Sequence, residues 1–106
     1  MRGSGGDPSA RRVRILRHKL VQFVKTAPDT AFVGSEAAHL DASGRIRRDA
    51  RRRALAVSKK FDASSVEEWG DLTSRFVHAL ELEAPGIVVQ LPPDEPRLAY
   101  AGSKQL

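Results

Sequence analysis

The chain has 106 residues and a formal net charge of +5, a length that suits one small domain with a single core. It contains no cysteine, which excludes disulfides, thiolate zinc sites and cysteine nucleophiles. No apolar run is long enough to span a bilayer, and we expect a protein without a membrane span, located in the cytoplasm.

The charge is divided unevenly along the chain. Residues 8–60 contain 14 basic and four acidic residues, whereas residues 61–96 contain eight acids and one base, Arg75. A basic half of this kind is typical of proteins that bind nucleic acid or an acidic surface. Attraction between the two halves, within the fold or across a dimer, is the alternative interpretation.

Residues 1–7 are rich in glycine and serine, and we expect a disordered leader there. Asp7 and Pro8 form a typical helix start, and Pro28 disfavours helical backbone at the residue before it. The sequence therefore predicts a helix over about 8–26. Its apolar stripe would comprise Val13, Leu16, Leu20, Phe23 and Ala27.

A less regular stretch, 29–42, comes before the next regular pattern. Residues 30–33 are typical of a short strand or an extended connection, and residues 35–40 of one or two helical turns. From 44 to 60 the chain has eight basic residues and one acid, Asp49. Its apolar residues recur every three or four positions, which predicts a helix with one docked face and an arginine-rich outer face. That apolar stripe is Ile46, Ala50, Ala54, Val57 and Phe61.

A third helix is predicted from Ser64 to about residue 83. Ser64 and Glu67 have the spacing of a capping box, and Trp69, Phe76 and Leu80 share one face. Gly70 would either permit close packing against another helix or split the segment in two. Pro85 and Gly86 end the pattern.

Residues 87–91 and 97–101 favour strands, and the proline-rich, acidic segment 92–96 separates them. We therefore predict a mainly α (α+β) domain over 8–102, with a three-helix core, a C-terminal β-hairpin and a frayed tail at 103–106. Two architectures fit this order. One is a helical bundle covered by the hairpin, and the other is a winged helix over 44–102, with a second helix at 65–70 and the hairpin as its wing.

No pattern of residues indicates catalysis or a metal site. The three histidines lie on separate segments, and Glu36 and His39 give only one copy of a di-iron spacing that requires two. Phosphate-binding glycine loops and nucleophile elbows are absent from the sequence. We expect a non-enzymatic protein without cofactor or metal.

The arginine-rich helix favours a nucleic-acid-binding function, with DNA preferred over RNA, because guanidinium groups bind phosphate oxygens bidentately. A regulatory or architectural protein, acting as a homodimer in the cytoplasm, nucleoid or nucleus, would fit this pattern. The predicted phosphate contacts are Arg45, Arg47, Arg48, Arg51, Arg52 and Arg53, supported by Arg11, Arg12, Arg14 and Arg17.

A protein-interaction module is the main alternative. Its basic half would dock on an acidic protein, or on the acidic half of a second copy, with Trp69, Phe76 and Tyr100 as candidate interface anchors. Ordinary core packing is the simpler explanation for Trp69 and Phe76. A membrane-surface role for the first helix ranks third, because its apolar face is needed for the core.

Overall fold

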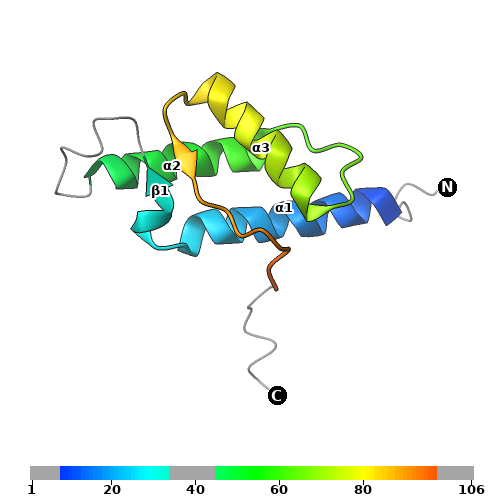
Figure 1. Ribbon diagram of the computed structural model, residues 1–106. Helices are drawn as coiled ribbons and strands as arrows, with labels where there is room; N and C mark the ends of the chain where they lie inside the picture. The colour runs from blue at the N-terminus through cyan, green and yellow to red at the C-terminus, as the bar shows by residue number, and fades with distance from the viewer. Residues whose placement is uncertain (1–7, 34–44, 98–106) are drawn as a thin grey trace, which may run out of the picture.

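The computed structural model of the chain describes residues 8–33 and 45–97, and three helices make up most of them (Figure 1). The helices are α1 (Pro8–Thr26), α2 (Arg45–Lys60) and α3 (Trp69–Glu83). A 3-10 turn, η2 (Asp29–Ala31), precedes the strand β1 (Phe32–Val33), and β2 (Val88–Val89) follows α3. The mainly helical class is confirmed. The predicted leader and frayed tail lie outside the described residues.

The helix α1 has the bounds that the sequence predicts. The N–H of Ala27 donates to the Phe23 carbonyl at 2.8 Å, which completes the last turn. The backbone then becomes extended at Pro28, whose ring disfavours helix at the preceding residue. Three residues of α1 are fully buried: Leu16 and Leu20, which belong to the predicted apolar stripe, and Val24 beside it.

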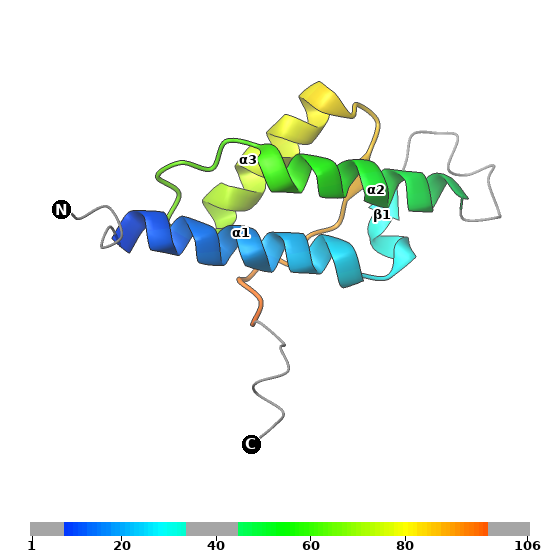
Figure 2. The ribbon, with the colours of Figure 1, turned by 180° about the vertical axis from the view of Figure 1, so that it is seen from behind.

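The helices α1 and α2 lie side by side and antiparallel, and they form one layer (Figure 2). α2 buries small residues, Ala50 and Ala54, together with Val57. Ser58 is the buried polar residue of this helix, and its hydroxyl donates to the Leu55 carbonyl at 2.7 Å. Its polar group is therefore satisfied within the helix.

The helix α3 crosses one side of the α1–α2 layer, and the core lies between them (Figures 1 and 2). Phe76 is fully buried there, with its ring centroid 5.6 Å from that of Phe61. Leu72 and Leu80, one turn away on either side, are also buried. The opposite side of the α1–α2 layer has no helix over it in the described residues (Figure 2).

The predicted capping box is wrong, because α3 begins at Trp69, beyond both of its members. The Ser64 hydroxyl donates instead to a carboxylate oxygen of Asp62, and Ser65 has left-handed backbone with φ 67°. This turn carries Val66, which is completely buried, into the core. The burial of the Val66 side chain therefore stabilises this loop more than a capping box formed by Ser64 and Glu67 would.

Gly70 has neither of the roles considered from the sequence, because it lies in the first turn of α3 with no heavy atom within 4 Å of a Cβ built on it. We expect Gly70→Ala to raise the free energy of unfolding by up to about 1 kcal/mol, since alanine loses less backbone entropy on folding. Chemical denaturation of the two proteins would measure this. A loss of stability would show that the position is constrained.

The two strands pair antiparallel, with Phe32 opposite Val89 and Val33 opposite Val88. The short strand considered at 30–33 is thus present in part. The sequence predicts that β2 pairs with a return strand at 97–101, but within the described residues β2 pairs with β1. Most of the predicted return strand, residues 98–101, lies outside the described residues. The C-terminal hairpin is not confirmed.

The winged-helix arrangement is likewise not confirmed. Residues 61–68 form turns and extended backbone where that architecture requires a second helix. The order of elements suited a winged helix, but the spatial arrangement is an antiparallel helix pair crossed by a third helix. None of the helices in residues 8–33 and 45–97 is long and apolar enough to cross a membrane.

Candidate functional site

Arg51 of α2 binds the C-terminal end of α1. Its guanidinium group donates to the carbonyl oxygens of Val24 at 2.8 Å, Lys25 at 3.1 Å and Ala27. It also forms an ion pair with Asp29 at 2.7 Å. Carbonyls at a helix end have no partner within the helix and carry partial negative charge. Arg51 therefore caps α1.

Arg17 of α1 does the same for α2. It donates to the carbonyl oxygens of Ser58 at 2.8 Å and Phe61 at 2.6 Å. Each of these two arginines also lies over an aromatic ring: the Cζ atom of Arg17 is 4.7 Å from the Phe61 centroid, and that of Arg51 is 4.6 Å from the Phe32 centroid. The antiparallel helices thus cap each other through stacked arginines.

The reciprocal caps change the role of two predicted phosphate contacts. Arg17 and Arg51 direct their donors at carbonyls of their own chain, and the Arg51 side chain is only 21% exposed. Both residues therefore contribute to the fold rather than to a free cationic surface. Arg51 and Arg52 are neighbours in the sequence of α2. The sequence pattern does not show that Arg51 faces α1 whereas Arg52 faces solvent.

Arg12 is also engaged within the chain. Its two terminal nitrogens donate to the two carboxylate oxygens of Glu95 at 3.0 and 2.5 Å, and Lys19 pairs with the same carboxylate at 2.5 Å. The hydrogen bond from Arg12, followed by that from Lys19, lowers the pKa of Glu95 to about 2. The hydrogen bond to Glu95 also raises the pKa of Arg12.

The lowered pKa of Glu95 predicts a specific acid dependence of stability. An unfolded glutamate titrates near 4.5 and the folded one near 2, so the ion pairs stabilise the fold fully above about pH 5 and progressively less as the pH falls toward 2. We expect Glu95→Gln to cost about 1–2 kcal/mol at neutral pH, since the groups are partly solvated.

Urea denaturation of both proteins across this pH range would measure the difference. The difference between wild type and Glu95→Gln should shrink toward zero near pH 2. If the difference in free energy of unfolding between the two proteins were the same at pH 7 and pH 2, the ion pairs of Glu95 would not be the cause of the stabilisation.

A second group of cations remains exposed on the α1–α2 layer, on the face turned away from α3. On α2, Arg48, Arg52 and Lys59 follow one another at steps of four and seven residues, which places them on one stripe opposite the buried side. On α1, Arg14 and Lys25 lie three turns apart on the corresponding stripe. We call these five residues the basic ridge: Arg14, Lys25, Arg48, Arg52 and Lys59.

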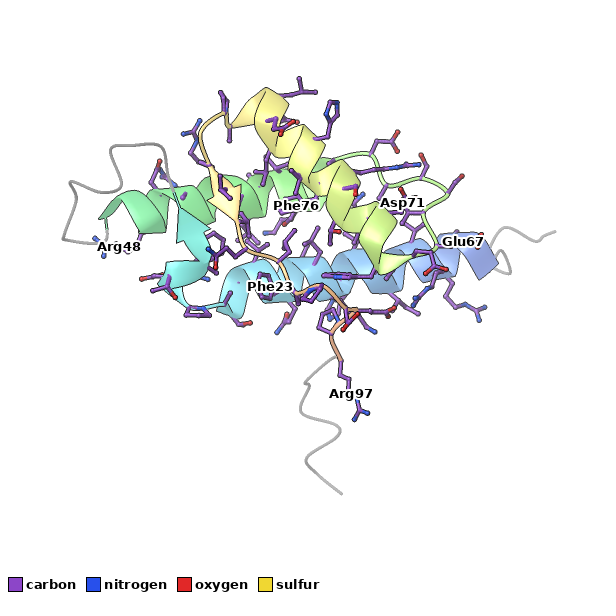
Figure 3. The ribbon with its side chains drawn as sticks, viewed as in Figure 1. Phe23, Arg48, Glu67, Asp71, Phe76 and Arg97 are labelled. Atoms are coloured by element: carbon purple, nitrogen blue, oxygen red, sulfur yellow. The ribbon has the colours of Figure 1, made fainter. Side chains whose placement is uncertain are left out.

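The ridge is a pair of parallel rows. Each row is about 16 Å long at 1.5 Å per residue, and packed helices lie about 8–10 Å apart. Helical spacing places Val21 and Leu55, both half-buried, between the two rows. Arg48 projects from the beginning of α2 (Figure 3). The helix pair therefore presents an elongated, flat array of positive charge.

Few acids interrupt this array. Within the described residues α1 carries none, and α2 carries only Asp49, which pairs with Arg52 on the surface. The other acids lie mainly around α3 and the segments flanking it, as Glu67 and Asp71 illustrate (Figure 3). Most of the described acids thus lie on segments other than the two helices that carry the basic ridge.

The remaining predicted contacts are distributed around this ridge. Arg11 is exposed on α1 beside it. Arg53 is exposed on the flank of α2 toward α3, the same flank as Lys60, which pairs with Glu83 at 3.1 Å. The side chains of Arg45 and Arg47 lie outside the described part of the structure.

The predicted interface anchors are not at a surface. Trp69 is 4% exposed, with its indole N–H donating to the Pro92 carbonyl at 2.9 Å, and Phe76 is completely buried. Both belong to the core of the single chain, which corrects their assignment as interface residues. Tyr100 lies outside the described residues. The large apolar residues that are exposed include Val77, Leu82 and Val88.

Other kinds of site have little support. In the described ranges no three histidine or acidic side chains gather in a way that could hold a metal ion. Glu36 and His39 lie outside those ranges. An open hollow of about 560 Å³ between the end of α2 and α3 is lined by residues of both charges, among them Lys60, Arg75 and Glu83. It lies beside α3, on the other side of the layer from the basic ridge.

Comparison of the chain with protein-family models, with curated proteins and with solved structures finds no significant match in any of the three.

Proposed function

We propose that this protein binds duplex nucleic acid, DNA in particular, through the sugar-phosphate backbone, as a non-enzymatic architectural or regulatory protein. The observation that carries the proposal is the basic ridge, whose cations face solvent on a surface almost without acids. A row of about 16 Å runs alongside about five nucleotides of one strand at 3.4 Å per charge. Arginine and lysine on such a row bind phosphates without reading base sequence.

The aromatic residues favour a duplex over a single strand. Proteins that bind single strands stack unpaired bases on exposed aromatic rings. Within residues 8–33 and 45–97 no aromatic side chain is exposed: Phe23 is half-buried and the others are buried. Backbone binding by helix-borne cations needs no such rings.

The proposal predicts steep salt dependence. If all five ridge residues contact phosphates, the logarithm of the binding constant for a random duplex should fall with the logarithm of salt concentration at a slope of about −4.5. Replacement of Arg48 and Lys59 by glutamine should reduce the magnitude of that slope by about 1.8 and weaken binding at least about tenfold at moderate salt. Fluorescence anisotropy with a labelled duplex of random sequence would measure both quantities.

The matched control removes the same charge elsewhere. Arg53 and Arg97 are both exposed, and they lie off the ridge. The double variant Arg53→Gln, Arg97→Gln should keep nearly the wild-type slope. Absence of binding at low salt, or equal losses in both double variants, would reject the proposal. Equally tight binding of polyglutamate would favour an acidic protein partner instead.

A further inference from the structure

The flank of α1 that faces away from α2 holds a second cationic site. Arg12 and Lys19 are seven residues apart, so they lie on the same side of the helix. Residues 90–97 leave β2 and cross α1 (Figures 1 and 3). The bond from the Trp69 indole to the Pro92 carbonyl fixes the beginning of this segment, and three prolines stiffen it. It delivers Glu95 to both cations.

The geometry around Glu95 is that of an occupied anion site. The two Nη atoms of Arg12 bind the two carboxylate oxygens, and the Lys19 Nζ adds a third donor to one of them. A guanidinium fork with an adjacent ammonium suits a phosphate group equally well, since phosphate also offers two oxygens to the fork. The carboxylate thus takes the position that a phosphate would need.

This site continues the basic ridge around α1. Beyond Arg14 and Lys25, the exposed surface of the helix passes through His18 and Arg11. It then reaches Ile15, which is 38% exposed and lies between Arg12 and Lys19 in the sequence. The exposed side of α1 between the basic ridge and the Glu95 site carries no acidic residue.

We infer that Arg12 and Lys19 form a phosphate-binding extension of the basic ridge, which the Glu95 carboxylate occupies as an internal competitor. The inference rests on the proposed function. It assigns to the C-terminal segment a regulatory role: the segment lowers affinity for nucleic acid until a backbone phosphate displaces its carboxylate.

Displacement is an exchange of anions. The side chains of Arg12 and Glu95 are 36% and 25% exposed, so solvent anions reach the pair. Glu95, whose pKa is lowered to about 2, is fully ionised at neutral pH, so protonation does not release the cations there. The phosphate replaces the carboxylate as the oxygen acceptor of the hydrogen bonds that Arg12 donates, so Arg12 requires little desolvation beyond that already present.

The test compares Glu95→Gln with Asp94→Asn. Both changes remove one negative charge from neighbouring positions, but Asp94 is exposed and makes no ion pair with a described residue. With the same random duplex, Glu95→Gln should steepen the salt slope by about 0.9, the value for one additional phosphate, and bind several-fold more tightly at low salt. Asp94→Asn should keep the wild-type slope.

A third protein completes the comparison. Adding Arg12→Gln and Lys19→Gln to Glu95→Gln should remove the gain. Equal slopes for Glu95→Gln and Asp94→Asn would overturn the inference while leaving the ridge proposal intact. Failure of wild type and Glu95→Gln alike to bind at low salt would instead reject the proposed function. Binding by Glu95→Gln alone would mean that the competitor blocks the surface completely.

A measurement on the unmodified chain avoids any effect of the substitutions on folding. The carboxyl ¹³C signal of Glu95 should shift when duplex is added, because the carboxylate leaves its two cationic partners, whereas the Asp94 signal should change little. An unchanged Glu95 signal in the bound protein would overturn the inference.

Discussion

Replacement of Phe76 by alanine is expected to destabilise the protein by about 3–5 kcal/mol, because it removes a fully buried ring and leaves a cavity. The ring contacts Phe61 at the centre of the only core in the described residues. Domains of this size have a total stability of about 5–15 kcal/mol. The substitution should therefore leave a substantial unfolded fraction at moderate urea concentrations.

Urea unfolding followed by fluorescence would measure this effect, since Trp69 is the single tryptophan and is buried. Leu82→Ala is the control, because Leu82 is on the same helix and 72% exposed; it should change stability by less than about 0.5 kcal/mol. If Phe76→Ala kept its stability but altered sedimentation, Phe76 would be an interface residue after all.

The substitution Arg51→Ala is expected to cost about 2–4 kcal/mol, a large effect for a charged residue. It leaves three carbonyls at the end of α1 without their donor, breaks the ion pair with Asp29 and removes the group stacked on Phe32. Loss of a hydrogen bond to a charged group typically costs about 1.5–3 kcal/mol, and water can replace part of it.

The matched control is Arg48→Ala, one turn earlier on the same helix but exposed; its effect on stability should stay within about 0.5 kcal/mol. Arg51→Lys should recover only a minor part of the loss, because an ammonium group cannot reproduce the planar fork. Thermal unfolding would show the difference as a shift of about 4–8 °C per kcal/mol. If Arg51→Ala had wild-type stability but bound the duplex more weakly, Arg51 would be a phosphate contact rather than a cap of α1.

The contrast between Arg48 and Arg51 explains why the site could be predicted only in part. Both residues are arginines on the basic side of one amphipathic pattern, and helical periodicity alone assigns both to solvent. Whether an arginine remains free depends on the carbonyls and carboxylates that the neighbouring helix and the distant C-terminal segment bring near it. Those partners are separated from it in the sequence, as Glu95 is from Arg12.

The loop before α3 and the strand pairing have the same explanation. The Ser64 pattern is a local signal for a helix start, but the burial of Val66 overrides it. The sequence shows that residues near 88 favour a strand. The packing of α1 against α3 decides which strand pairs with these residues. It brings the segment after α1 beside the segment after α3, with Phe32 opposite Val89.

What the sequence by itself determined is the extent of α1 and α2, most of the described residues that these helices bury and the separation of basic from acidic segments. These properties depend on interactions between residues a few positions apart, such as the spacing of apolar side chains and the backbone restriction at Pro28. Only the tertiary structure decided which cations remain available. Arg51, Arg17 and Arg12 donate to carbonyls or carboxylates of their own chain, whereas an exposed arginine has no such partner close to it in space. Tertiary structure decides this difference, because hydrogen bonds and ion pairs depend on the distance between groups in space.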